Sequence, residues 1–240
     1  MRTSNPIINS NTLYNVHASG AEAMTVNGAV QKTLYLAVIL TAGAAITWWM
    51  GVPGMALSLL GLIGGLISAI VLIFKREWAP TLAPVYALCE GLALGGISMM
   101  FERSYPGIAF QAVGMTIGVL FCMIGLYKSR IIKVTDQFRM GVVSATGGIA
   151  LFYLISMVAG LFGFPMTFLN GSGPLSIGIS LLIVGVAALN LVLDFDSIEQ
   201  AAQHQLPKYM EWFLAFGLMV TLVWLYLEML RLLSKFQRRD

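Results

Sequence analysis

The sequence has little charge for its length. Only 10% of its 240 residues are Asp, Glu, Lys or Arg, whereas 58% are hydrophobic. A soluble domain carries about 25% charged residues, so this composition excludes an ordinary soluble protein. Uncharged apolar runs recur along the chain, and a run of about 20 such residues is what crossing a bilayer requires. The composition therefore predicts an integral membrane protein.

Cysteine is also scarce, and the N-terminus has no apolar leader. The only two cysteines, Cys89 and Cys122, lie inside apolar runs, which favours small buried hydrophobes over a disulfide framework. Residues 1–31 are polar and contain no hydrophobic segment of the secretory type. We interpret them as a flexible tail on the side of synthesis, the cytoplasm. A short amphipathic helix at about 21–30 is the alternative.

Seven apolar segments are predicted to be transmembrane helices, because only helices satisfy their own backbone groups in lipid while remaining continuously apolar. No period-2 alternation supports a membrane β-barrel. We expect an all-α, multi-pass bundle over residues 32–236, followed by a basic C-terminal tail over 237–240. The segments are about 33–50, 55–74, 81–101, 108–127 and 140–164, then 175 into the LDFDSIE motif, and 212 to the basic tail.

Pairs of glycines spaced four residues apart predict close contacts between these helices. Each pair is weak evidence alone, because the chain contains 25 glycines. Together they favour a tight bundle over seven loosely associated spans. The pairs are Gly61 with Gly65, Gly91 with Gly95, and Gly114 with Gly118.

The lysines and arginines orient the chain. If all seven segments cross from a cytoplasmic N-terminus, nine basic residues lie on the inner side and five on the outer side. Four of those five belong to the C-terminal region, so the side of the C-terminus stays open. The basic residues are spread over short loops, which favours anchoring to the lipid bilayer and argues against a nucleic-acid partner.

Four carboxylic acids lie within or at the end of apolar segments, where ionisable groups are costly and normally mark a functional path. Glu90 is either a pore or proton-path carboxylate, or a protonated acid bonded to a neighbouring helix. Asp194 and Asp196, at i and i+2, point to nearly opposite sides of a helix and cannot share one partner. A wet helix end is the alternative interpretation of this pair. The fourth acid, Glu228, follows a long uncharged run.

Glu228 has two candidate partners. Arg231, at i+3, could pair with it on the same helix. Alternatively, Glu228 meets Asp194, because consecutive helices commonly pack antiparallel. Two carboxylates in a low-dielectric site cannot easily both ionise, so they would share a proton. Loss of that proton would leave a site for Ca²⁺ with Lys75 or Arg76 as counter-charge, which predicts a pH-biased element beside a cation path.

Three stretches of the sequence resemble the Bax inhibitor-1 (TMBIM) family, in particular its bacterial YccA-like branch. They are EGLALGGIS on the third segment, LDFDSIEQ on the sixth and MEWFLAFGLMVTLVWLYLEMLRLL on the seventh. The resemblance covers most of the chain from about residue 32 onward. It implies a bundle whose last helix is held centrally by the other six, and a location in the bacterial inner membrane.

The resemblance also implies a pH-sensitive calcium leak governed by an acidic pair on the sixth and seventh helices. Matched motif by motif, the gating acids and tentative calcium ligands fall on Asp194 and Glu228, and the basic residue falls on Arg76 or Lys75. The chain departs from the family in having Glu228 where an aspartate is usual. Asp196 adds a charge that many relatives lack. Beyond calcium and protons as ions, no cofactor is expected.

Two other functions remain as alternatives. The stronger is a non-conducting regulator that binds other membrane proteins, such as a membrane protease. The weaker is a membrane enzyme: Ser172 lies in NGSGP, but Asn170 stands where a serine protease has glycine. The two histidines, His17 and His204, lie in a tail and a loop on the other side of the membrane. The sequence therefore argues against an enzyme.

Overall fold

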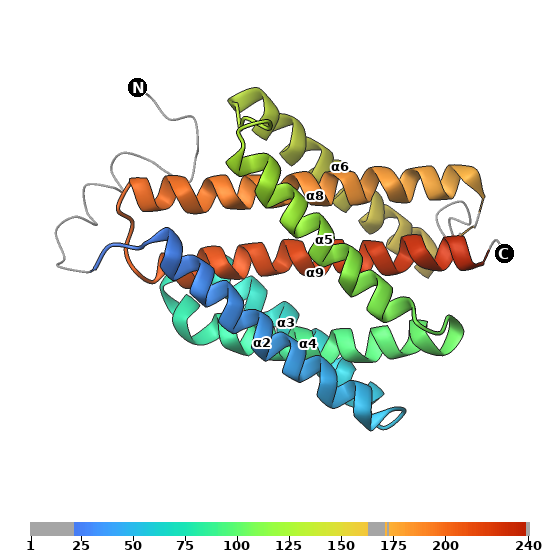
Figure 1. Ribbon diagram of the computed structural model, residues 1–240. Coiled ribbons are helices and arrows are strands. Elements are labelled where there is room, and N and C mark those ends of the chain that lie inside the picture. Colours follow the sequence, from blue (N-terminus) through green and yellow to red (C-terminus); the bar gives the residue numbers. More distant parts are fainter. Residues whose placement is uncertain (1–21, 163–170, 172, 239–240) are drawn as a thin grey trace.

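The computed structural model describes residues 22–162, 171 and 173–238, and this part of the chain is a bundle of seven helices (Figure 1). A single turn, η1 (Arg76–Trp78), links the second helix to the third, and the described residues form no strand apart from one isolated bridge. The helices are α2 (Val26–Met50), α3 (Gly54–Phe74), α4 (Ala79–Ser104), α5 (Ile108–Lys128), α6 (Asp136–Leu161), α8 (Pro174–Gln203) and α9 (Met210–Gln237).

Each of the seven helices is long and apolar enough to cross a membrane. The predicted all-α, seven-helix membrane fold is therefore confirmed. Residues 163–170 and 172 lie outside the described part, and with them most of the stretch between the fifth and sixth spans, including Asn170 and Ser172 of the enzyme alternative.

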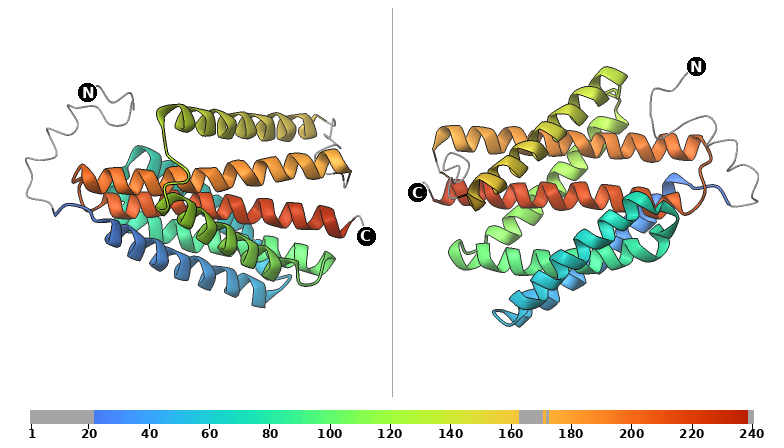
Figure 2. Two further views of the ribbon diagram at one scale, coloured as in Figure 1. Left: turned by 45° about the horizontal axis from the view of Figure 1, so that its top comes forward. Right: turned by 180° about the vertical axis from the view of Figure 1, so that it is seen from behind.

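The last helix, α9, is central, as the family resemblance implies. It packs against α8, α2, α5 and α4, and it contributes side chains to both buried apolar clusters. One cluster joins α9 to α5 and α8, and the other joins it to α2, α3 and α4. Figures 1 and 2 show α8 and α9 side by side along the length of the molecule, with α2 to α4 on one side and α6 at the opposite edge.

Close packing in the first half of the chain depends on glycine, because α4 lies directly against α2 and α3. A Cβ at Gly91 would lie 2.1 Å from the Leu40 carbonyl oxygen, and one at Gly61 would lie 2.5 Å from the Cys89 carbonyl oxygen. Neither distance is sterically allowed, so only glycine permits these backbones to approach. The first two predicted glycine pairs therefore lie at helix contacts.

The third predicted pair, Gly114 with Gly118, does not lie at a contact between helices. A Cβ at Gly114 or Gly118 would meet nothing within 4 Å. Both glycines lie on α5, whose packed face instead carries Ile108, Ala112 and Met123. The spacing alone could not distinguish a packed glycine from an open one.

The predicted polar tail over residues 1–31 ends earlier than expected. Helix α2 already begins at Val26, where the Thr25 hydroxyl accepts a hydrogen bond from Gly28 N and caps the helix. Met24 is buried, and its N–H donates to Leu206 O in the loop between α8 and α9. Residues 22–31 are thus part of the folded domain, and residues 1–21 lie outside the described part.

Candidate functional site

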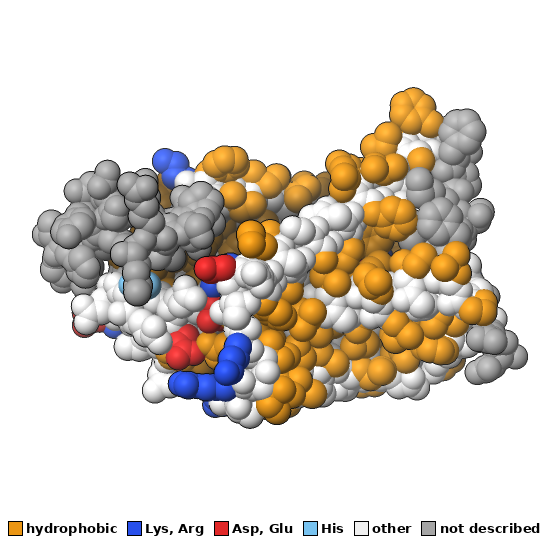
Figure 3. All heavy atoms as spheres, turned by 90° about the horizontal axis from the view of Figure 1, so that it is seen from above, with side chains coloured by type: hydrophobic (Ala, Val, Ile, Leu, Met, Phe, Trp, Pro, Cys, Tyr) orange, Lys and Arg blue, Asp and Glu red, His pale blue; other side chains and the backbone are white. Residues whose placement is uncertain are grey.

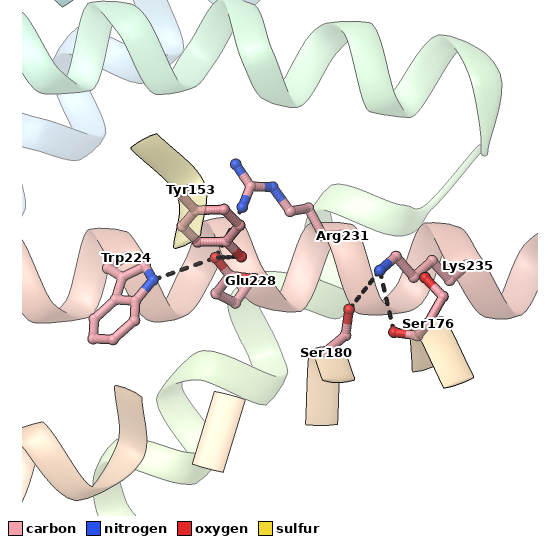
Figure 4. A network of polar contacts seen from close by, with 7 residues as sticks. All are labelled: Tyr153, Ser176, Ser180, Trp224, Glu228, Arg231 and Lys235. Atoms are coloured by element: carbon pink, nitrogen blue, oxygen red, sulfur yellow. Dashed lines mark hydrogen bonds and ion pairs between the residues drawn. The ribbon is translucent and has the colours of Figure 1, made fainter. Parts of the chain in front are cut away.

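Glu228 lies at the centre of a polar network in the apolar bundle (Figure 4). Its side chain is only 1% exposed, and its Oε1 accepts hydrogen bonds from three groups. The Tyr153 hydroxyl of α6 donates at 2.8 Å, Arg231 Nη1 at 2.9 Å and Trp224 Nε1 at 3.3 Å. The other oxygen, Oε2, is enclosed and has no hydrogen-bond partner in the structure.

Arg231 is therefore the partner that the i+3 spacing allowed. Its guanidinium also lies over the Tyr153 ring, 5.0 Å from the ring centre, so one arginine contacts both the acid and the phenol. Because the Arg231 side chain is 48% exposed, it can leave Glu228 without being trapped in the bundle.

Asp194 lies on α8 and faces α9. The Thr221 hydroxyl of α9 is the polar group beside its carboxyl. Its Oδ2 is enclosed and, like Glu228 Oε2, has no hydrogen-bond partner. The structure thus contains two enclosed, unpartnered carboxyl oxygens, and they come from the two helices that the sequence singles out.

The register of α8 against α9 sets the separation of these two acids. Lys235 Nζ donates to Ser180 Oγ at 2.7 Å, and Asp194 faces Thr221. These two contacts are 14 residues apart on each helix, so the helices run antiparallel in one continuous register. On that register Glu228 and Asp194 are seven residues out of step, which is about 10 Å along the helix axis.

No hydrogen bond joins the two carboxyls, since Asp194 Oδ2 and Glu228 Oε2 both lack a partner. Arg231 and Tyr153 bond to Glu228 Oε1 instead, and the proton sharing expected from the sequence stays a prediction. The acids nevertheless lean toward each other, since helical side chains tilt toward the helix N-terminus and these helices are antiparallel.

Asp196 points away from that contact. Its Oδ2 accepts Arg139 Nη2 of α6 at 2.5 Å and Gln200 Nε2 at 2.7 Å. The predicted divergence of Asp194 and Asp196 to different sides of α8 is confirmed.

Glu90 is half-buried on α4 and lies beside a glycine of α3. A Cβ at Gly65 would lie 2.8 Å from Glu90 Oε2, so the glycine makes room for the carboxylate. Within the described residues the Glu90 carboxylate makes no hydrogen bond that would tie it to a neighbouring helix. Its role as an accessory acid stays a prediction.

The basic counter-charges predicted at the end of α3 lie elsewhere. Arg76 stacks on the Phe213 ring, 5.3 Å from its centre, near the start of α9. Within the described part of the chain, neither Arg76 nor Lys75 forms an ion pair with either buried acid. The cations of the α9 network are instead Arg231 and Lys235, which the sequence could indicate because they follow Glu228 at i+3 and i+7 on one helix face.

Helix α6 carries a polar stripe that the sequence analysis missed. Val142 is the only described residue of α6 that is buried, so apolar packing holds this helix weakly. Three polar side chains spaced by seven residues instead bond to α8 and α9. The bonds are Arg139 to Asp196, Thr146 to Asn190, and Tyr153 to Glu228. The seven-residue spacing of polar residues in an apolar helix was the available signal.

No multidentate metal site is assembled. Among the residues that the structure describes, no three His, Cys, Asp or Glu side chains are close enough to hold one metal ion.

Comparison with known proteins gives one match. The family model described as Bax inhibitor 1 like matches residues 5–238, which is almost the whole chain. No curated protein and no solved structure matches this chain.

Proposed function

Because the chain belongs to the Bax inhibitor 1 like family, we propose that it is a pH-sensitive calcium leak in a bacterial inner membrane, with its N-terminus in the cytoplasm. One observation supports this most directly. Asp194 Oδ2 and Glu228 Oε2 are enclosed carboxyl oxygens without hydrogen-bond partners, and they belong to α8 and α9, the two helices that pack against each other along the molecule. We assign Asp194 and Glu228 as the gating acids.

The proposed switch follows from the cost of burying charge. When both acids carry protons, the stretch between them has no charge to attract a cation. When they lose their protons, two anions lie in a low-dielectric site, where an unpaired charge costs several kcal/mol. Ca²⁺, a hard cation that prefers carboxylate oxygen, offsets that cost. Calcium passage therefore rises with pH.

Two cations of α9, Arg231 and Lys235, must be considered when calcium binds to ionised Glu228. Arg231 bonds to Glu228 and therefore competes with calcium for the ionised acid, whereas Lys235 lies further along α9 and bonds to Ser180. Arg231 is half-exposed and can turn outward, which would free Glu228 Oε1 for the permeant ion. Only Asp194 has no cation bonded to it, and we therefore assign it the larger share of the pH response.

Calcium flux into liposomes tests the proposal. We expect purified protein to give calcium entry, read with an enclosed fluorescent indicator, that rises between pH 6 and pH 8. Asp194→Asn abolishes the rise because the amide cannot ionise. Glu77→Gln is the matched control, since Glu77 is exposed and outside the network. Equal flux from wild type, Asp194→Asn and empty vesicles would refute a leak.

A non-conducting regulator that binds other membrane proteins is the second candidate. The observation that favours it is α6, whose outer face is apolar and whose only buried described residue is Val142. Such a face can pack against a helix of another protein, for instance a membrane protease. The same flux assay separates the two functions, because a regulator carries no calcium. We propose no enzymatic activity and no cofactor for either.

A further inference from the structure

A cavity with charged walls lies between the α5–α6 loop and the end of α8. Its volume is about 470 Å³. The end of α5 and the loop after it contribute Lys128, Arg130 and Lys133 to its lining, and α8 contributes Asp196 and Glu199. This cavity is separate from the stretch between Asp194 and Glu228 that we assign to the leak.

The acids of the cavity already have partners. Asp196 is bonded to Arg139, and Glu199 Oε2 accepts the Tyr127 hydroxyl at 2.5 Å. The Glu199 Oε1 atom also accepts an amide N–H of Gln203 at 3.3 Å. The acidic wall is thus engaged in contacts with its own neighbours.

The three cations of the cavity have no partner among the residues that the structure describes. Within the described residues, no ion pair or hydrogen bond involves the side chain of Lys128, Arg130 or Lys133. Asp196 is paired with Arg139, and Glu199 bonds only to the neutral side chains of Tyr127 and Gln203, so the lining holds three cations and one acid without an ion-pair partner. Three unpaired cations beside one hollow favour an anionic ligand.

The loop that carries these cations is held in one shape. Arg130 has a φ of 56°, in the left-handed region that arginine adopts only when its surroundings require it. Its N–H donates to Tyr127 O at 3.0 Å. Ile132 and Val134 pack against the core cluster of α8 and α9, so Lys133 between them is presented outward.

The surroundings of the loop are those of a membrane surface. Ile131, next to the cations, is 72% exposed, and Phe121 of α5 and Met140 of α6 are 67% and 63% exposed. In a bundle that crosses the membrane, such apolar side chains next to lysines and arginines lie where acyl chains meet headgroups. Figure 3 shows the same division, with charged side chains at one end of the molecule and hydrophobic side chains over the rest of that face.

We propose that this cavity binds the phosphate of an anionic phospholipid from the adjacent leaflet, with Lys128, Arg130 and Lys133 as its ligands. The lipid's acyl chains would lie along the exposed apolar side chains of α5 and α6. Free phosphate has the same charge chemistry, but it would leave that apolar surface unused. The proposal is independent of whether the protein conducts calcium.

Binding to the full-length chain in detergent tests the proposal. Short-chain phosphatidylglycerol is titrated, and the shift in melting temperature gives the apparent dissociation constant. We expect saturable stabilisation of the wild type. The triple substitution Lys128→Gln, Arg130→Gln and Lys133→Gln weakens binding roughly tenfold or more, since each surface cation contributes measurably to anionic lipid affinity. If the triple variant does not fold, Arg130→Gln alone replaces it in the titration and is expected to weaken lipid binding.

Two controls decide the outcome. The double substitution Lys75→Gln and Arg103→Gln removes two exposed cations, one just after α3 and one in the last turn of α4, and leaves the affinity unchanged. Inorganic phosphate, and a short-chain diacylglycerol without phosphate, give no saturable shift. Equal lipid affinity in the wild type and the cavity variant overturns the site. Saturable stabilisation by inorganic phosphate at the same concentration overturns the assignment to a lipid.

Discussion

Among the glycines that the structure describes, Gly91 is the one at which an added Cβ would lie nearest to a backbone atom of another helix. A Cβ at this position would lie 2.1 Å from the carbonyl oxygen of Leu40 and 3.0 Å from its Cα, and both are backbone atoms that cannot rotate away. We expect Gly91→Ala to force α2 and α4 apart and to destabilise the protein by about 1–3 kcal/mol, the usual cost of overpacking. The melting temperature of the purified protein in detergent measures this effect.

Gly114→Ala is the matched control for that substitution. Both glycines lie inside a helix, but a Cβ at Gly114 would meet nothing within 4 Å. Alanine is favoured over glycine in a helix by roughly 0.5–1 kcal/mol, so this variant should melt at or slightly above the wild-type temperature. A similar loss of stability in both variants would show that the contact between α2 and α4 is not the cause.

At the residue scale, the sequence predicted those features of the candidate site that depend on spacing within one helix. The i+3 spacing indicated the bond between Glu228 and Arg231, and the i+2 spacing indicated that Asp194 and Asp196 diverge. The register of α8 against α9 was not predictable, because side chains from several helices set it. The seven-residue offset between Asp194 and Glu228 and the bond from Tyr153 therefore emerged only from the structure.

At the scale of one element, α6 is held mainly by polar bonds at intervals of two turns. Arg139→Gln and Tyr153→Phe together remove the donors at its two ends, and each bond to a carboxylate contributes about 1.5–3 kcal/mol. We expect amide hydrogens in α6 to exchange at least about tenfold faster in the double variant, because a loss of 1.4 kcal/mol already gives that factor. Exchange in α2 and α4 stays unchanged. Mass spectrometry of α6 peptides measures the rates.

Tyr35→Phe controls for the loss of a phenol hydroxyl. Tyr35 lies on α2, is 54% exposed and contacts Trp212 through its ring, which the substitution keeps. Exchange in α6 should not respond to it. If the Arg139→Gln and Tyr153→Phe variant also left α6 exchange unchanged, the polar stripe would not be what holds this helix.

The ends of the elements show where sequence patterns stop being informative. Apolar runs placed all seven spans because each helix faces lipid over much of its surface. The apolar runs placed the start of α2 too late, because residues 26–31 include Asn, Gly and Gln. These residues belong to the helix because Thr25 caps it and Met24 is buried. Hydrophobicity marks the part of a helix in the membrane, whereas capping and tertiary contacts mark where the helix begins.

For the molecule as a whole, the structure shows which lysines and arginines count as loop charges when the two ends of the bundle are compared. Of the five basic residues assigned to the outer side, Arg231 and Lys235 lie within α9 and bond to Glu228 and Ser180. They therefore act inside the bundle and do not contribute as loop charges. The remaining contrast between the two ends favours a cytoplasmic position for the α5–α6 loop and an external position for the α4–α5 loop. If all seven helices cross the membrane, this orientation predicts an external C-terminus.

Labelling of introduced cysteines tests this orientation. In a background with Cys89→Ser and Cys122→Ser, a membrane-impermeant maleimide should label Ser104→Cys, at the end of α4, in intact cells. It should label Ser129→Cys, just after α5, only once the membrane is permeabilised. Both serines are exposed, so a difference in labelling reports the side of the membrane and not burial. The reverse pattern would invert the bundle and place the three cations of the proposed lipid site on the outer leaflet.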